Sequence, residues 1–277
     1  MTQPEPGVPP TASVKTSVFG SLGDVLRKTI VITGSEVRKL RHDPSELIVR
    51  AVQPALWLII FGEVLSRMHA IPSDEMAYVD FLAPGILAQS AMFIAIFGGM
   101  SLIWERDLGI VHKFLVSPTP RIALALGKSL AGGVRALSQA VIVYLLALIM
   151  GVHINWHPLN LLAVVVVVVV GAMVFTSFSL IIALIVKTRE RFVGIGQVLT
   201  MPFFFASSAI YPISVMPSWL QVLARINPLT YQVDALRVLM VNSSISNHML
   251  WIDFAVLFGA ATVLTAIAGK LYPRAAT

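Results

Sequence analysis

The stretch LNLLAVVVVVVVGAMVFTSFSLIIALIV, residues 159–186, decides the fold class of this chain. It contains seven consecutive valines, Val164 to Val170, and valine-rich runs of this kind are typical of buried β-strands. The apolar stretch around the valines is too long for a strand, whereas a helix that crosses a bilayer needs about 20 mostly apolar residues. We therefore interpret residues 159–186 as a membrane-spanning helix.

The composition of the whole chain supports this interpretation. Its 277 residues are 57% hydrophobic and 12% charged, and the mean hydropathy is +0.83. Soluble domains have about 25% charged residues. The absence of cysteine excludes disulfides and Cys-based metal sites. The net charge of +6 comes from Lys and Arg residues in short segments between apolar runs, so it indicates membrane topology rather than nucleic-acid binding.

Five further apolar runs have a length that suits a spanning helix. The first run is the weakest, because Pro54 and Glu63 interrupt it. We therefore predict an all-α polytopic membrane protein with six transmembrane helices, at residues 49–66, 81–103, 123–150, 159–186, 192–212 and 250–269.

The basic residues predict the orientation of these spans. Of the 20 Lys and Arg residues, 16 fall on one side of the predicted membrane, three on the other, and Arg135 lies inside the third span. The positive-inside rule then puts both termini in the cytoplasm. Residues 1–20 are polar and Pro-rich, so we expect a disordered cytoplasmic tail, followed by a single transmembrane domain at 21–277.

Residues 21–43 precede the first span and have apolar side chains at helical spacing. This pattern predicts an amphipathic helix that lies on the inner leaflet of the bilayer. A surface helix on a cytoplasmic domain is the alternative, although little chain lies outside the spans to form such a domain. The basic residues of this interfacial helix fall mostly off the apolar stripe: Arg27, Lys28, Arg38, Lys39 and Arg41.

The sequence lacks the residue patterns that ATP binding, metal binding and membrane-embedded catalysis require. The GKS at 127–129 ends like a phosphate-binding loop, but that motif needs a Gly where Ile122 stands, so we predict no ATP site on this chain. His153 and His157 lie in a predicted loop, which argues against a metal site. No polar cluster suggests a membrane-embedded enzyme. A gradient-driven secondary transporter remains the alternative function, although no pair of ionisable groups falls near the predicted bilayer midplane.

The segment WERDLGIVHKFLVSP, residues 104–118, interrupts the apolar pattern on the predicted cytoplasmic side. Its mixed charges and apolar residues predict a short helix across the membrane surface with a polar face free to dock. Gly109 allows a tight turn, and Pro118 ends the helix. A simple solvated connector is the alternative.

Two stretches carry a family resemblance. Residues 104–128 resemble the signature region of type-2 permeases of ABC exporters. Residues 209–237, AIYPISVMPSWLQVLARINPLTYQVDALR, resemble the stretch before the last span in the daunorubicin-resistance and nodulation-factor exporter branch. Within residues 104–128, the pair His112-Lys113 departs from the Glu-Lys-like residues often found in the signature region. The matching residues are Glu105, Arg106, Gly109, Phe114, Leu115, Ser117, Pro118, Arg121, Gly127, Lys128, Asn227 to Tyr231, and Val233 to Arg237.

The resemblance implies a permease subunit in a bacterial inner membrane that exports a drug-like, lipid or lipid-linked glycan cargo. ATP and magnesium would be held by a separate ABC ATPase subunit, present in two copies, and a second permease copy would meet this one along the first and fifth spans. Residues 104–117 would form the coupling helix. Its expected contacts to the ATPase are Glu105, Arg106, Gly109, His112, Lys113, Phe114 and Pro118.

The loop before the last span predicts two outer-face re-entrant helices within residues 213–241. Pro217 suits a first helical turn, Asn227-Pro228 ends that helix, and Asp234 and Arg237 are spaced for an ion pair. A gate and a structural cap both fit this pattern. The candidate residues for a substrate path or gate, for which packing or lipid contact is the alternative, are Phe203, Phe204, Phe205, Tyr211, Asn227 and Tyr231. We interpret the polar residues Gln89, Ser90, Gln139 and Gln197 as helix-packing groups.

Overall fold

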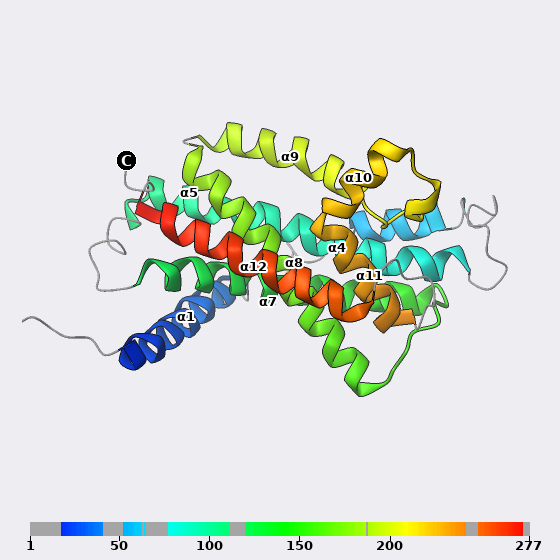
Figure 1. Cartoon of the computed structure of the whole chain (residues 1–277), viewed down its shortest axis with the longest axis horizontal. Helices are drawn as coiled ribbons and strands as arrows, with labels where there is room; N and C mark the ends of the chain where they lie inside the picture. The colour runs from blue at the N-terminus through cyan, green and yellow to red at the C-terminus, as the bar shows by residue number, and fades with distance from the viewer. Residues whose placement is uncertain are drawn as a thin grey trace, which may run out of the picture.

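The computed structural model describes residues 18–40, 52–62, 64, 77–110, 120–186, 188–241 and 249–273. Within these ranges every regular element is helical and none is a strand, which confirms the all-α prediction (Figure 1). The elements are α1 (Val18–Leu40), η1 (Trp57–Phe61), α4 (Tyr78–Gly98), α5 (Met100–Asp107), α7 (Arg121–Ile149), α8 (Pro158–Ile185), α9 (Arg189–Phe205), η2 (Ile213–Val215), α10 (Ser218–Ile226), α11 (Pro228–Val241) and α12 (Leu250–Leu271).

Among the described residues, four helical segments are long and apolar enough to cross a membrane: Tyr78–Asp107, Arg121–Ile149, Pro158–Ile185 and Leu250–Leu271. They match the second, third, fourth and sixth predicted spans. The first predicted span corresponds to a shorter apolar helix, Val52–Phe61, and the fifth corresponds to α9, which has 17 residues. The chain is therefore a multi-pass membrane protein, and the count of six spans stays a prediction.

Helix α8 lies at the centre of the bundle, where it contacts α4, α7, α11 and α12. The valine run supplies part of this core, because Val164, Val167 and Val168 are buried while Val165 is partly exposed. This alternation follows the helical period and not the period of two that a strand would show. The valine-rich stretch is thus part of a helix with a buried face.

Glycines let the central helices approach one another closely. A Cβ atom added at Gly132 or Gly133 of α7 would overlap Thr176 or Val169 of α8, and one added at Gly171 would overlap Gln232 of α11. Inside a membrane, helix association depends on close packing and interhelical hydrogen bonds, and small residues permit both. These positions therefore fix the spacing of α7, α8 and α11.

A chain of buried hydroxyl groups joins three of the spanning helices. Ser129 Oγ of α7 lies 2.8 Å from Ser177 Oγ of α8, which lies 2.8 Å from Thr265 Oγ1 of α12. All three side chains are almost fully buried. Hydrogen bonds between such hydroxyls hold transmembrane helices in one rotational register.

Helix α1 packs on the N-terminal part of α7 and diverges from the bundle (Figure 1). It begins three residues before the predicted start at residue 21, and residues 41–43 lie outside the described part of the chain. Thr29 is buried, whereas Leu26, Ile30 and Val31 are largely exposed. An uncovered apolar face beside α7 fits contact with lipid, and the interfacial role stays a prediction. Of its predicted basic residues, Arg27 and Arg38 are exposed and Lys28 is half-buried, while nothing is described of the side chains of Lys39 and Arg41.

Candidate functional site

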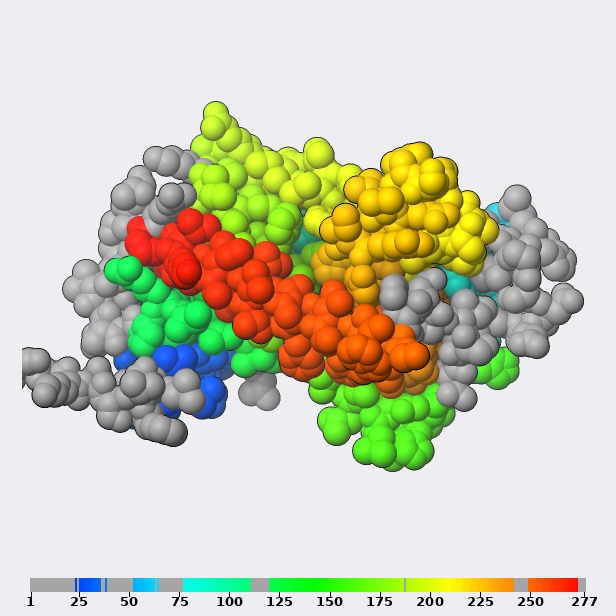
Figure 2. Space-filling view, viewed as in Figure 1, coloured from blue at the N-terminus to red at the C-terminus, as the bar shows by residue number. Residues whose placement is uncertain are grey.

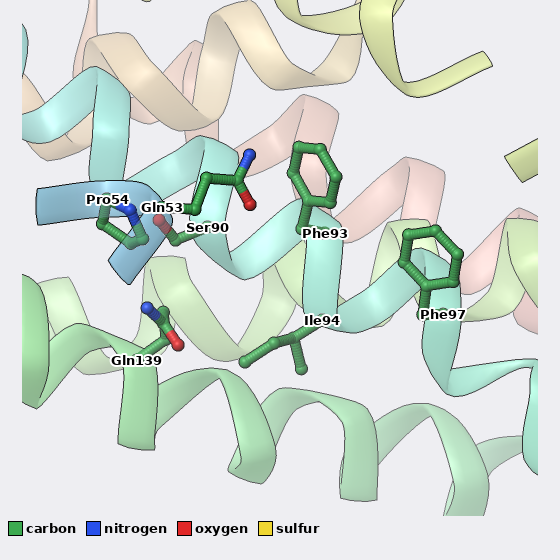
Figure 3. Close-up of a pocket in the computed structure, with 7 residues that line it drawn as sticks. All are labelled: Gln53, Pro54, Ser90, Phe93, Ile94, Phe97 and Gln139. Carbon is green, nitrogen blue, oxygen red and sulfur yellow. The ribbon is translucent and has the colours of Figure 1, made fainter. Parts of the chain in front are cut away.

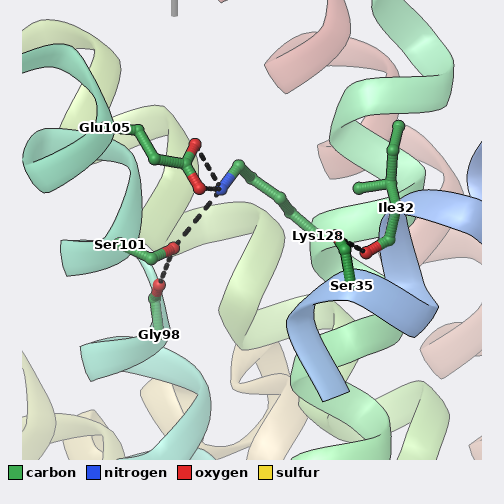
Figure 4. Close-up of polar contacts among 6 residues, drawn as sticks. All are labelled: Ile32, Ser35, Gly98, Ser101, Glu105 and Lys128. Carbon is green, nitrogen blue, oxygen red and sulfur yellow. Dashed lines mark hydrogen bonds and ion pairs between the residues drawn. The ribbon is translucent and has the colours of Figure 1, made fainter. Parts of the chain in front are cut away.

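The charged end of α5 is anchored by a buried ion pair. Lys128 Nζ of α7 lies 2.8 Å from Glu105 Oε2 and 2.9 Å from Oε1, and the side chains are only 6% and 10% exposed (Figure 4). Lys128 Nζ also lies 3.5 Å from Ser101 Oγ, which donates to the Gly98 carbonyl. The pair therefore fixes the end of α5 against the start of α7.

A second set of contacts joins α5 to the start of α9. Arg189 Nη2 lies 2.7 Å from Asp107 Oδ2, and the guanidinium lies 3.7 Å from the centre of the Trp104 ring. Arg106 Nη2 donates to the Val186 carbonyl at 3.1 Å. The 104–107 segment is thus held by charged contacts on more than one side, with Trp104 and Asp107 still partly exposed.

Helix α1 reaches the same corner of the molecule. Thr33 Oγ1 donates to the Gly127 carbonyl at 3.2 Å, one residue before Lys128. A Cβ atom added at Gly127 would overlap Ile32, so α1 and α7 are in direct contact there. We call residues 104–107, together with Lys128, Arg189 and the Thr33 contact, the cytoplasmic corner, after the side on which the sequence predicts them.

The structure divides the predicted 104–117 helix. Residues Trp104–Asp107 form the last turn of α5, which continues the second span, and a turn at Leu108-Gly109 follows before Ile110. Gly109 has φ +68°, a left-handed conformation that Gly adopts without steric cost, so it ends the helix. The expected turn at Gly109 is present. The predicted contact residues His112, Lys113, Phe114 and Pro118 lie outside the described residues.

At the opposite end of the bundle, Asn227 joins α9 to α11. Its Nδ2 donates to the carbonyls of Phe203 and Ala206, both at 2.6 Å, and its Oδ1 accepts from the Leu229 backbone N–H at 3.0 Å. Asn227 therefore caps the end of one helix and the start of another. The predicted helices within 213–241 are present, and α10 ends at Asn227 as expected.

The aromatic residues predicted as a substrate path point in different directions. Phe204 is fully buried, with its ring centroid 5.2 Å from that of Trp57, while Phe203 packs at 5.7 Å from Phe175. Phe205 is 43% exposed. Consecutive helical residues project about 100° apart, so the three rings do not form one surface.

The two tyrosines among the path candidates, Tyr211 and Tyr231, bond to backbone carbonyls in the structure. The Tyr211 hydroxyl donates to the Phe205 carbonyl at 2.6 Å, and the Tyr231 hydroxyl donates to the Arg225 carbonyl at 2.7 Å. Phe203 and Asn227 do line a shared cavity of about 220 Å³ between α9 and α10. The role of a path or gate stays a prediction for these residues.

The predicted Asp234–Arg237 pair is present and buried. Arg237 Nη1 lies 3.4 Å from Asp234 Oδ1, and Ser208 Oγ donates to the same oxygen at 3.0 Å. The Arg237 guanidinium also donates to the Ser208 carbonyl and lies 3.8 Å from the centre of the Phe81 ring. Burial lowers the pKa of Arg237 to about 10, opposed by the nearby Asp234 carboxylate, so Arg237 stays protonated at neutral pH.

The connection between α7 and α8 is tied to α4 by an exposed histidine. His153 Nδ1 lies 3.0 Å from Asp80 Oδ2, and the His153 backbone N–H donates to Asp80 Oδ1. His157 does not join them: its backbone N–H donates to Asn155. In the described part of the chain, no group of three or more His, Cys, Asp or Glu side chains is arranged to hold a metal ion.

A cavity of about 210 Å³ lies between the helix at 52–61, α4 and α7 (Figure 3). Three polar side chains, Gln53, Ser90 and Gln139, gather at one side of it, and the Phe93 and Phe97 rings extend along α4 from there. We call this space the amide cavity. From the sequence we interpreted Ser90 and Gln139 as helix-packing groups. No sequence pattern identified Gln53 as a candidate site residue.

Comparisons with known proteins identify a family of transport proteins. Residues 27–241 match the family model described as ABC-2 type transporter. The chain is 31% identical over 212 residues to "Putative transport permease ycf38" of Cyanophora paradoxa, covering 74% of this chain and 71% of that protein.

Two bacterial relatives match a similar portion of the chain. The chain is 25% identical over 201 residues to "Daunorubicin resistance ABC transporter permease protein DrrB1" of Streptomyces coeruleorubidus, covering 72% of this chain and 70% of that protein. It is 23% identical over 216 residues to "Nodulation protein J" of Rhizobium leguminosarum bv. viciae, covering 77% and 82%. The chain therefore belongs to the ABC-2 type transporter family.

Proposed function

We propose that this chain is the permease subunit of an ATP-driven exporter in a bacterial inner membrane. ATP and magnesium would be bound by a separate ATPase subunit in two copies, and two permease copies would form the working unit. Both termini would lie in the cytoplasm. Membership of the ABC-2 family supports a permease that is not itself an enzyme.

The cytoplasmic corner is the observation that carries this proposal. The last turn of α5 is fixed to α7 by the buried Glu105–Lys128 pair and contacts α9 through the more exposed Asp107–Arg189 pair. A displacement of the turn at Gly109 would therefore be transmitted to α5, α7 and α9 together. A subunit that couples ATP hydrolysis to transport needs such an element, because nucleotide binding on one chain must shift an equilibrium in another.

The arrangement of the helix ends supports the orientation. The ends of α5 and α12 and the starts of α7 and α9 lie at the same end of the bundle, and each carries Lys or Arg (Figure 1). Helices α10 and α11 lie at the opposite end. This distribution fits a cytoplasmic side at the corner that contains Gly109.

The proposed direction of transport, export, is inferred from the names of the relatives. The names of three matching proteins refer to daunorubicin resistance, doxorubicin resistance and nodulation. We propose a drug-like, lipid or lipid-linked glycan cargo for this chain. A gradient-driven secondary transporter is the competing function, and it would work without an ATPase subunit.

Copurification from native membranes tests the proposal, and the chain offers a matched pair of variants. Gly109 and Gly151 both have positive φ values, +68° and +76°, and a Cβ atom at either would meet open space. Gly109→Val and Gly151→Val therefore impose a similar local strain, of about 1–2 kcal/mol, at opposite ends of the bundle.

We expect the tagged wild-type protein and Gly151→Val to copurify with a stoichiometric ATPase subunit in mild detergent, and Gly109→Val to lose it. Mass spectrometry identifies the partner. A chain that purifies alone under every detergent condition would overturn the proposal and favour the secondary transporter. Equal ATPase recovery with both variants would overturn the role of the cytoplasmic corner.

A further inference from the structure

The amide cavity is formed by three helices that are distant in the sequence. Gln53 and Pro54 come from the helix at 52–61, Ser90 from α4 and Gln139 from α7 (Figure 3). Its volume of about 210 Å³ is below the 300–1,000 Å³ typical of sites that enclose a whole drug-sized ligand. It would therefore hold one end of such a molecule.

The polar side of the cavity offers hydrogen bonds without charge. Gln53 and Gln139 supply amide groups, and Ser90 supplies a hydroxyl whose own proton is donated to the Ile86 carbonyl at 2.7 Å. Ser90 therefore keeps acceptor capacity toward the cavity. Of the residues that the structure describes, none that lines the cavity is Lys, Arg, Asp or Glu.

The uncharged character of the described lining residues favours one class of ligand. A charged group moved from water into a membrane-depth cavity needs a partner of opposite sign, and the cost is large without one. Hydroxyl and carbonyl groups, in contrast, match amide side chains in both donor and acceptor roles. The polar side thus suits an uncharged hydrogen-bonding group.

The apolar side of the cavity follows one face of α4. Phe93, Ile94 and Phe97 follow Ser90 by three, four and seven residues, so they lie along the same helix face. The Phe93 and Phe97 rings have centroids 6.3 Å apart and planes within 19° of each other. Nearly parallel rings along a helix present an apolar wall to a flat molecule.

We propose that the amide cavity binds one end of the exported cargo, and that this cargo is an uncharged amphipathic molecule with a flat apolar body and a hydroxyl or carbonyl group. The flat body lies along Phe93 and Phe97, and the polar group bonds to Gln53, Ser90 and Gln139. This inference rests on the proposed export function and narrows its cargo class.

Equilibrium binding of a defined probe tests the inference. The full chain, with whatever subunits copurify, is placed in lipid nanodiscs, and bound tritiated progesterone is measured by scintillation proximity against empty nanodiscs. Progesterone is uncharged and flat and carries carbonyl groups at its ends. Tritiated tetraphenylphosphonium, a permanent apolar cation without hydrogen-bonding groups, is the contrasting probe.

The variants separate the cavity from the rest of the membrane surface. Gln53→Leu and Gln139→Leu remove amide groups at similar side-chain size, and Ser90→Ala removes the hydroxyl. Gln197→Leu is the matched control, because Gln197 is an exposed amide on α9 that does not line the cavity. Circular dichroism and size-exclusion chromatography check that each variant remains folded.

We expect saturable progesterone binding that each cavity variant weakens about 3- to 10-fold, since each loses one neutral hydrogen bond. Gln197→Leu should bind like the wild type, and the phosphonium ion should show no saturable binding above empty nanodiscs. If Gln139→Leu does not fold, Gln53→Leu and Ser90→Ala decide the result.

Wild-type affinity in all folded cavity variants would overturn the inference, and so would an absence of saturable progesterone binding to the wild-type protein. Tighter binding of the phosphonium ion would overturn it as well. Copurification of the ATPase distinguishes these failures from failure of the export function: a protein that retains its ATPase but binds no progesterone refutes only the cargo class.

Discussion

The Glu105–Lys128 pair gives the sharpest quantitative prediction, through Glu105→Gln and Lys128→Met. At 2.8 Å and an effective dielectric constant of about 20, the attraction between the two charges is about 6 kcal/mol. The desolvation of both charges offsets much of that attraction. Removal of one partner leaves the other charge buried, which costs about 3–5 kcal/mol.

The assay is thermal unfolding of the purified protein in detergent, followed by fluorescence-detected size exclusion. At roughly 2–4 °C per kcal/mol for a chain of this size, each single variant should lower the Tm by about 6–20 °C. The double variant Glu105→Gln/Lys128→Met should lose less than the worse single variant, because neither charge remains unpaired. This recovery is the signature of direct coupling.

Asp107→Asn is the control, since the Asp107–Arg189 pair is about 40% exposed on both sides. Exposed pairs contribute about 0–1 kcal/mol, so its Tm should change by less than about 4 °C. Single variants at Glu105 and Lys128 that unfold like the wild type would refute the reasoning. A double variant whose loss equals the sum of the two single losses would refute it too.

Three further predictions concern packing and capping. Gly132→Val should overlap Thr176 of α8 and lower the Tm by more than Gly23→Val, whose site in α1 is open. Asn227→Ala should lose three backbone hydrogen bonds and destabilise the protein by about 1–3 kcal/mol, measured by the same unfolding assay, and a change under 0.5 kcal/mol would contradict the capping role. Ser177→Ala should break both bonds of the hydroxyl chain and lower the Tm by a few degrees, whereas no change would show that the chain adds no stability.

Much of the fold could be predicted from local sequence. The four long spans were predicted to within a few residues, because an uninterrupted apolar length has few other structural solutions. The boundaries of α10 and α11 followed from Pro217 and Asn227-Pro228, which act on the backbone directly. The Asp234–Arg237 pair followed from helical spacing alone.

The second span shows where local patterns failed. Its apolar run ends near residue 103, but the helix continues to Asp107, because charged residues mark a membrane boundary and do not end a helix. Gly109 ends it through its left-handed conformation. The fifth predicted span is shorter in the structure, because α9 ends at Phe205, and the described apolar helix within the first predicted span is Val52–Phe61.

The contacts of the candidate site depend on tertiary structure that the sequence does not encode locally. Nothing near Glu105 indicates that its partner is Lys128, 23 residues away on another helix. Likewise, the amide cavity brings together residues of three helices whose rotations are fixed only by packing. The aromatic triplet at 203–205 looked like one cluster in the sequence, but only the Phe204 and Phe205 rings lie side by side, at 5.5 Å, while Phe203 packs on Phe175.

A site-specific cross-link tests the coupling role of the cytoplasmic corner, and because this chain has no cysteine, each introduced thiol is its only labelling site. Leu108→Cys places one thiol at the exposed turn next to the cytoplasmic corner, and Trp156→Cys places one at an exposed site in the connection between α7 and α8. Each protein is labelled with a maleimide benzophenone in native membranes and irradiated. We expect the Leu108→Cys protein to form an adduct with an ATPase subunit, and the yield of this adduct to change with ATP. The Trp156→Cys protein should form no such adduct. An ATPase adduct from Trp156→Cys alone, or from neither variant, would contradict the coupling role.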